Sequence, residues 1–234
     1  MTPLLLIPGM MCDARMWGAI PAALQPRPVL HHVPNGTETG AETMAKLAAH
    51  ALAEAPPRFA LAGLSMGGIL AMEILAQAPD RVERLALLDT NPRAELPEIQ
   101  ARREPQIARA LKGGLAMVMR DEMKPNYVAS GPGKQAVLDL CMEMALALGP
   151  RVFARQSRAL RDRADRQRVL AAFRKPALVL MGAEDRLCPL ERHQLMHDLM
   201  PQSQLVIIES AGHLPTLERP DETTAALRRW LEDE

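Results

Sequence analysis

The stretch LAGLSMGG at residues 61–68 places a single serine between glycines, directly after an apolar run. Gly63-Leu64-Ser65-Met66-Gly67 has the spacing G-x-S-x-G, with the apolar run RFALAG before it and the helix-like pattern GGILAMEILAQA after it. Glycines two residues before and after the serine relieve steric clashes where the chain reverses from strand to helix. Ser65 is therefore predicted to be a nucleophile, raised into a cleft at the end of a buried strand.

Short apolar runs bounded by Pro, Gly, Asn or Asp recur around this turn and predict buried parallel strands. They lie at residues 2–8, 27–33, 58–63, 82–89, 176–182 and 204–209. Segments with apolar positions three or four apart predict helices at about 13–25, 40–55, 66–78, 189–200 and 221–233. The alternation predicts an α/β fold, a doubly wound, mostly parallel sheet of about six strands with helices on both faces. Right-handed crossovers bring the loops after the strands to one edge, where a site is expected.

The alternation stops between Asn91 and about Arg174, where no strand is predicted. Helix-like segments at 98–123, 135–149 and 152–173 are separated by breaks such as residues 130–133 and Gly149-Pro150. We expect residues 1–90 and 175–234 to form the core and residues 91–174 to form a helical cap or lid over the active edge. The arginines of this insertion are expected mostly to face solvent, although one or two could bind a substrate carboxylate.

Charge and composition exclude several classes of partner. Lys+Arg and Asp+Glu both total 28, and no basic stripe predicts binding to nucleic acid or to an anionic membrane. Cys12, Cys141 and Cys188 lie far apart, which predicts neither a disulfide framework nor a structural zinc site. The sequence has no signal-peptide core and no run of about 20 apolar residues, so a cytoplasmic protein is expected. The 15 methionines indicate an adaptable apolar cavity, although methionine is also ordinary core filler.

A serine hydroxyl needs a base to take its proton and a carboxylate to orient that base. Asp185 follows the strand predicted at 176–182, and His213 follows the strand predicted at 204–209. Between them there is room for one helix and one returning strand, which would bring both side chains to the edge that carries Ser65. The predicted catalytic residues are therefore Ser65, Asp185 and His213.

Other acids and histidines compete for these roles. Asp89 ends the run at 82–88 and is the second plausible acid, while Glu184 is expected to face solvent. Asp185 is favoured because its G-x-x-D spacing and the following Pro189 place it on a loop. The other histidines, expected at a strand end, on the surface or in packing, are His31, His32, His50, His193 and His197. The last two are four apart on a helix and could share a metal, but no third ligand is in view.

Charge on the attacked carbonyl oxygen is usually stabilised by backbone N–H groups. Met66 follows the nucleophile, and Met10 follows Gly9 in the loop after the first strand, so their N–H groups are the predicted oxyanion hole. Candidates for the pocket wall, although residues of this kind belong more often to the core, are Met11, Trp17, Met117, Met123, Phe153, Leu187 and Leu214.

These motifs resemble those of the α/β-hydrolase family over nearly the whole chain. PGMMCDARMW is similar to that family's oxyanion loop, GLSMGG to its nucleophile elbow, GAEDRLCP to its acid loop and AGHLPTLERPDE to its catalytic-histidine loop. The resemblance implies a Ser-His-Asp triad, a helical cap at 91–174, and neither a metal nor an organic cofactor. Pro8 stands where many members have histidine. The sequence begins at what resembles the family's third strand, which implies a six-stranded sheet without the N-terminal antiparallel strands.

The resemblance implies a serine hydrolase of a small carboxylic ester, thioester or lactone, acting through an acyl-enzyme. A serine at the elbow argues against the dehalogenase and epoxide-hydrolase branches, which use aspartate there. One alternative is a carbon–carbon lyase or synthase that uses Ser65 and His213 for proton abstraction, with Arg155 and Arg158 holding an acidic substrate. Another is a ligand-sensing receptor with little turnover. The expected partner is a small molecule, and the protein is expected to be a monomer or homodimer.

Overall fold

The computed structural model describes residues 1–35 and 43–232, which contain one six-stranded sheet in the order β2-β1-β3-β4-β5-β6. All of its strand pairs are parallel. The strands are β1 (Leu4–Ile7), β2 (Val29–His31), β3 (Phe59–Leu64), β4 (Val82–Leu88), β5 (Ala177–Gly182) and β6 (Ser203–Ile208). The predicted parallel α/β sheet is confirmed, and the observed strands agree with the predicted runs to within two residues at each end.

The central strands are apolar on both faces because each face packs against helices. In β3, Phe59 and Leu61 belong to the core on one side of the sheet, and Ala60 and Leu64 belong to the core on the other side. Alternate side chains of a strand point to opposite faces, so both sets must be apolar. This is why the strand appears in the sequence as a continuous apolar run.

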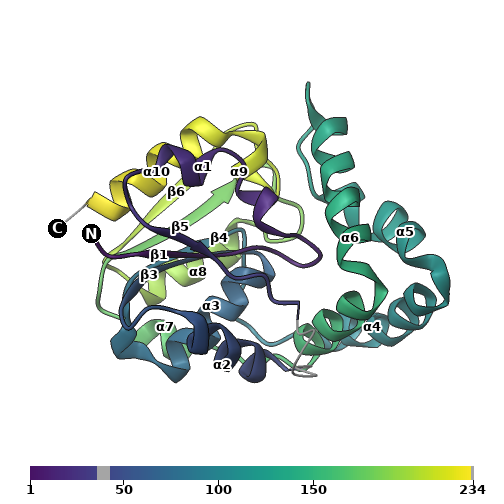
Figure 1. Ribbon diagram of the computed structural model, residues 1–234, viewed down its shortest axis with the longest axis horizontal. Helices are drawn as coiled ribbons and strands as arrows, with labels where there is room; N and C mark the ends of the chain where they lie inside the picture. The colour runs from purple at the N-terminus through teal and green to yellow at the C-terminus, as the bar shows by residue number, and fades with distance from the viewer. Residues whose placement is uncertain (36–42, 233–234) are drawn as a thin grey trace.

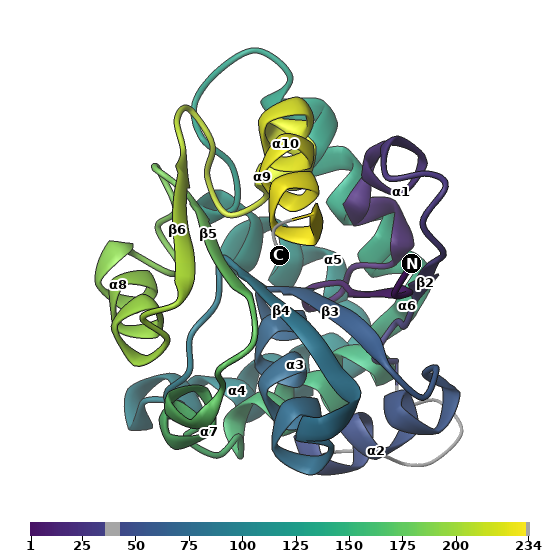
Figure 2. The ribbon, with the colours of Figure 1, turned by 90° about the vertical axis from the view of Figure 1, so that its left-hand side faces the viewer.

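Helices cover both faces of the sheet (Figure 2). On one face lie α2 (Met44–Glu54), α3 (Met66–Gln77), α7 (Gln167–Ala172) and α8 (Leu190–Leu199). On the other lie α1 (Ile20–Ala23), α9 (Pro215–Glu218) and α10 (Pro220–Glu232). Helices predicted at 66–78 and 189–200 are confirmed. Those predicted at 40–55 and 221–233 are seen as α2 and α10, although residues 40–42 and 233 lie outside the described residues.

The single helix predicted at 13–25 is wrong. The segment forms a short 3-10 turn, η1 (Ala14–Trp17), and then the one-turn helix α1. Gly18 between them has a φ of 51°, a conformation that no α-helix contains. Apolar spacing of three to four residues fits both pieces, so the pattern did not reveal the break.

A second group of helices lies beyond the carboxyl ends of the strands, at the right of Figure 1. It comprises α4 (Pro97–Arg109), η3 (Ala110–Gly114), α5 (Leu115–Met117), η4 (Val118–Met123), η5 (Lys124–Asn126) and α6 (Lys134–Arg161). We call residues 97–161 the helical segment. The sequence break at Gly149-Pro150 bends α6 instead of ending it, because Gly149 takes a φ of 80° and the helix continues on either side.

A short 3-10 turn, η2 (Pro79–Arg81), precedes β4. Within the described ranges, no helix has the length and apolar character needed to cross a membrane.

Candidate active site

Ser65 sits at the turn between β3 and α3 in a strained backbone conformation, with φ 56° and ψ −119°. The neighbouring strand holds this turn, because the Ser65 N–H donates to Leu88 O at 2.9 Å and Thr90 Oγ1 donates to Ser65 O at 2.7 Å. A Cβ at Gly67 would lie 2.0 Å from Ile7 O, and one at Gly63 would lie 2.2 Å from Gly67 O. Only glycine fits at either position, which is the physical reason for the G-x-S-x-G spacing.

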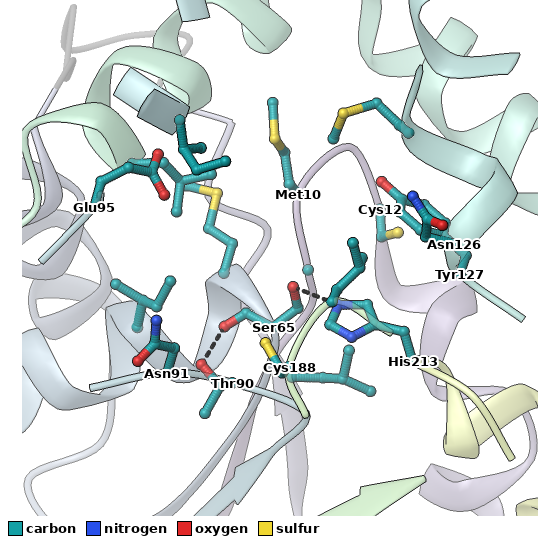
Figure 3. Close-up of a pocket in the computed structure, with 18 of the residues that line it drawn as sticks. Met10, Cys12, Ser65, Thr90, Asn91, Glu95, Asn126, Tyr127, Cys188 and His213 are labelled. Atoms are coloured by element: carbon teal, nitrogen blue, oxygen red, sulfur yellow. Dashed lines mark hydrogen bonds between the residues drawn. The ribbon is translucent and has the colours of Figure 1, made fainter. Parts of the chain in front are cut away.

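His213 joins Ser65 to Asp185. Its Nε2 lies 2.8 Å from Ser65 Oγ, and its Nδ1 lies 2.8 Å from Asp185 Oδ2 (the Ser65 contact is dashed in Figure 3). An ionised carboxylate only accepts hydrogen bonds, so Nδ1 carries the hydrogen and Nε2 is left to accept the serine hydroxyl. Asp185 and His213 are both buried. The structure thus brings the three predicted side chains together in the order that proton transfer from serine requires.

Asp185 is suited to hold a negative charge. Its Oδ1 accepts backbone hydrogen bonds from Leu187 at 2.8 Å and Cys188 at 3.1 Å. Burial raises the pKa of Asp185, but His213 and these two N–H groups lower it by more, so the pKa lies below the usual value for aspartate. The carboxylate is therefore an ionised acceptor for the imidazole N–H.

Asp89, the rival acid, has a different environment. It is fully buried, and its Oδ1 accepts the Gly182 N–H at 2.9 Å. Burial and the neighbouring charge of Asp185 raise the pKa of Asp89 well above its usual value. Asp89 therefore supports the start of the loop that carries Asp185, while Asp185 bonds the histidine ring.

The two predicted oxyanion residues both line the pocket around Ser65. Among the described residues, neither the Met10 N–H nor the Met66 N–H has a hydrogen-bond acceptor. The loop after β1 passes close to the serine, because a Cβ at Gly9 would lie 3.4 Å from Ser65 Cβ. Both N–H groups are thus available beside the nucleophile.

Gln156 supports this loop, and it was not identified from the sequence. It belongs to α6 and is fully buried. Its Oε1 accepts the Met11 N–H at 2.8 Å, and its Nε2 donates to Pro34 O at 2.9 Å. Met11 has a φ of 56°, so the loop is fixed in an uncommon conformation. The only signal in the sequence is one polar residue on an otherwise apolar helix face.

Glu218 supports the histidine loop in a similar way. Its carboxylate accepts backbone N–H groups from Gly212 at 2.9 Å, Leu214 at 3.0 Å and Ala129 at 2.8 Å. The His213 N–H in turn donates to Tyr127 O at 2.8 Å. Residues 127–129, which precede α6, are thereby tied to the loop that carries the imidazole.

The pocket above Ser65 has a volume of about 340 Å³, and Figure 3 shows part of its lining. Of the pocket candidates, Met123, Leu187 and Leu214 line it. The structure corrects the position expected for the other four. Met11, Trp17 and Phe153 are fully buried in the two cores, and Met117 is 50% exposed on the outside of the helical segment. Helical periodicity identifies an apolar face but not what covers it.

The remaining candidates lie away from the serine. His31 and Glu184 are exposed, His32 Nδ1 lies 3.0 Å from Glu54 Oε2, and His50 is near the same carboxylate. His197 Nδ1 lies 2.8 Å from Ser203 Oγ, while His193 is fully buried, and burial lowers its pKa to about 4. Within the described part of the chain, the one group with metal-ligand spacing is Asp185, Cys188 and His213, which shares two side chains with the Ser65 site.

The sequence matches the alpha/beta hydrolase family over residues 4–227. This match covers nearly the whole chain, so the protein belongs to that family. Among curated proteins, it is 26% identical to the pimeloyl-[acyl-carrier protein] methyl ester esterase of Aliivibrio salmonicida, over 99% of this chain and 92% of that protein. It is 28% identical to the enzyme of the same name from Klebsiella pneumoniae, over 93% of this chain and 88% of that protein.

Solved structures share its fold. A thermophilic esterase from Thermogutta terrifontis, with malate bound, has a TM-score of 0.87 and 29% identity, covering 99% of this chain and 89% of that one. The enol-lactonase of Burkholderia xenovorans also has a TM-score of 0.87, but at 23% identity the likeness shows the shared fold alone.

Proposed function

We propose that this protein is a carboxylic ester hydrolase that cleaves a small ester, thioester or lactone through an acyl-enzyme. The observation that carries the proposal is the hydrogen-bonded series Ser65 Oγ, His213 Nε2 and Nδ1, and Asp185 Oδ2, with 2.8 Å at each contact. The similarity to methyl ester esterases over nearly the whole chain supports the reaction class.

In the proposed reaction, Ser65 Oγ attacks the carbonyl carbon while its proton passes to His213 Nε2. The N–H groups of Met10 and Met66 stabilise the oxyanion that forms, and Asp185 stabilises the imidazolium. The tetrahedral intermediate then collapses, and His213 gives its proton to the departing alcohol or thiol. Water, activated by the same imidazole, attacks the acyl-enzyme and releases the acid, which restores Ser65.

We further propose that residues 91–174 act as a cap over a core formed by residues 1–90 and 175–234. Support comes from Met123, Tyr127 and Leu160, which line the pocket opposite the loops after the strands. Residues 167–172 form α7, which packs beside α3 and α8, so the part of the insertion that covers the pocket is the helical segment. The arginines of the lyase alternative, Arg155 and Arg158, are not among the lining residues.

The test is to trap the acyl-enzyme. Mixed with p-nitrophenyl acetate and quenched early, the protein is expected to gain the mass of one acetyl group, located on the peptide that contains Ser65. Ser65→Ala is expected to gain none and to lose turnover, whereas the exposed control Ser130→Ala should behave as wild type. Turnover that survives Ser65→Ala would overturn the proposal.

A further inference from the structure

The charges around the pocket do not balance. Among the described residues, four arginines and two glutamates line it: Arg102, Arg103, Arg163, Arg192, Glu95 and Glu122. Glu122 is already engaged, because it pairs with Arg109 from outside the lining and accepts a hydrogen bond from Gln106 at 3.0 Å. The pocket lining therefore carries an excess of positive charge. The buried arginines among these residues both pair with Glu95.

Glu95 lies between two buried guanidinium groups. Its Oε2 accepts from Arg103 Nη2 at 2.7 Å and from Arg103 Nε at 2.9 Å, while its Oε1 pairs with Arg163. The three side chains are 5%, 11% and 8% exposed for Glu95, Arg103 and Arg163. One carboxylate cannot neutralise two guanidinium groups, so the cluster has a net charge of +1 in a largely dehydrated place. Such a charge is costly unless an anion accompanies it.

Within the part of the chain that the structure describes, the Nη1 group of Arg103 donates only to a weak hydrogen-bond acceptor. This Nη1 is 3.7 Å from Met10 Sδ, and a thioether is a weak acceptor. Met10 is the residue whose N–H is available beside Ser65, and Figure 3 shows Met10 above Ser65 and Glu95 at the upper left of the same pocket. A guanidinium edge with a poor partner thus adjoins the cavity near the nucleophile.

We propose that Arg103, held by Glu95 and assisted by Arg163, is an anion subsite that binds a carboxylate at the far end of the substrate's acid portion. The preferred substrates are then half-esters of dicarboxylic acids, or lactones that bear a carboxylate. The planar fork of arginine matches a carboxylate with two parallel hydrogen bonds. This inference rests on the proposed ester hydrolysis, since it specifies the acid that the same site accepts.

The test compares kcat/KM for two methyl esters of similar length, monomethyl adipate, which is anionic, and methyl hexanoate, which is neutral. Arg103→Met is expected to lower the ratio of anionic to neutral kcat/KM by about 10- to 100-fold, the range for one charged hydrogen-bonded contact. The variant leaves Glu95 and Arg163 as a balanced pair, so it is expected to fold.

Two further variants sharpen the test. Glu95→Gln leaves two arginines unopposed and should raise the ratio of anionic to neutral kcat/KM. Arg168→Met, an exposed arginine on α7, is the matched control and should leave the ratio unchanged.

A ratio that Arg103→Met leaves unchanged would overturn the subsite while leaving ester hydrolysis intact. If the wild-type protein hydrolyses neither methyl ester and p-nitrophenyl acetate gives no acyl-enzyme, the proposed function fails, and the subsite is then judged by binding alone. In that case adipate should raise the Tm of the wild-type protein but not that of Arg103→Met, and no shift in either protein would refute the subsite.

Discussion

The edge of the sheet and the helical segment both contribute to the pocket, but the residues that they contribute occur in different sequence contexts. Ser65, Asp185 and His213 each follow a strand within a few residues, at β3, β5 and β6. The helical segment contributes single side chains from long helices: Arg103 on α4 lines the pocket, and Gln156 on α6 holds the loop after β1. The first group is located by local turn chemistry, whereas the second depends on how helices distant in sequence pack over the loops.

This difference separates chemistry from positioning. The groups proposed to react lie at the strand ends. The helical segment fixes two of the nearby loops: Gln156 bonds the loop after β1, and the backbone of Tyr127 and Ala129 bonds His213 and Glu218 in the histidine loop. Substitutions at the strand ends are expected to remove the reaction. Substitutions in the helical segment are expected to weaken or redirect it.

The largest contrast is expected between the two buried aspartates at the sheet edge. Asp185→Asn should lower kcat by about 10⁴-fold, because an amide cannot hold the imidazole in the required tautomer. Asp89→Asn should lower kcat by less than about tenfold, because the raised pKa of Asp89 favours a neutral carboxyl group that an amide imitates. Steady-state kinetics on methyl hexanoate measures both. Equal losses would show that the two acids share the role.

The next effect tests the link from the helical segment to the sheet edge. Gln156→Leu leaves the Met11 N–H without its acceptor and frees the loop that carries Met10, so kcat should fall by about 10- to 100-fold, below the loss of a whole oxyanion donor. Gln100→Leu is the matched control, because Gln100 donates to Arg161 O at 2.8 Å within the helical segment. Its kcat should change by less than about threefold. Similar losses in both variants would indicate general loosening of the helices.

A smaller effect concerns the stability of the core at acid pH. Burial lowers the pKa of His193 to about 4, below the unfolded value, so native His193 stays neutral while the unfolded chain takes up a proton. Its contribution to the free energy of unfolding is present above about pH 6.5 and is lost progressively toward pH 4. Between pH 7 and pH 5 this loss amounts to about 2 kcal/mol.

His193→Gln tests this contribution of His193 to stability, because glutamine keeps a donor near Pro189 O. The difference in free energy of unfolding between pH 7 and pH 5, measured in urea, should shrink by about that amount. An unchanged difference would show that His193 does not cause the acid sensitivity in this range. Asp185 acts at lower pH, because its pKa is lowered and the stabilisation from its carboxylate is lost only as the pH falls below the unfolded value of about 3.9.

The smallest effect distinguishes the two faces of the helical segment. Met117 lies on the exposed face, so Met117→Lys should change the free energy of unfolding by less than about 0.5 kcal/mol. It should also change the KM for methyl hexanoate by less than about twofold. Met123→Lys puts a charge into the pocket wall and should raise the KM for methyl hexanoate by about tenfold. A comparable rise in both variants would contradict the assignment of Met117 to the outer surface.

Prediction from sequence succeeded where a residue's conformation is constrained by its near neighbours. Gly63 and Gly67 must be glycine because a Cβ would collide with backbone atoms, and this constraint is visible as a spacing. The same local pattern did not separate Met123 from Met117, six residues apart, because helical periodicity does not say which face meets the pocket. It also did not reveal the break at Gly18 or the interior place of Gln156.

The sequence by itself determined the parallel sheet, the elbow at Ser65 and the placement of Asp185 and His213 after strands, since buried strands and tight turns restrict the residues that can form them. Only the tertiary structure decided that Gln156 and Glu218 hold the loops and that Arg103 and Arg163 share one carboxylate. Several of those contacts join residues far apart in the chain, namely Gln156 with Met11, Glu218 with Ala129 and Arg163 with Glu95. They depend on how the helices pack over the loops, for which no local rule exists. A hydrogen bond from α6 to the loop after β1 leaves no periodic trace in either segment.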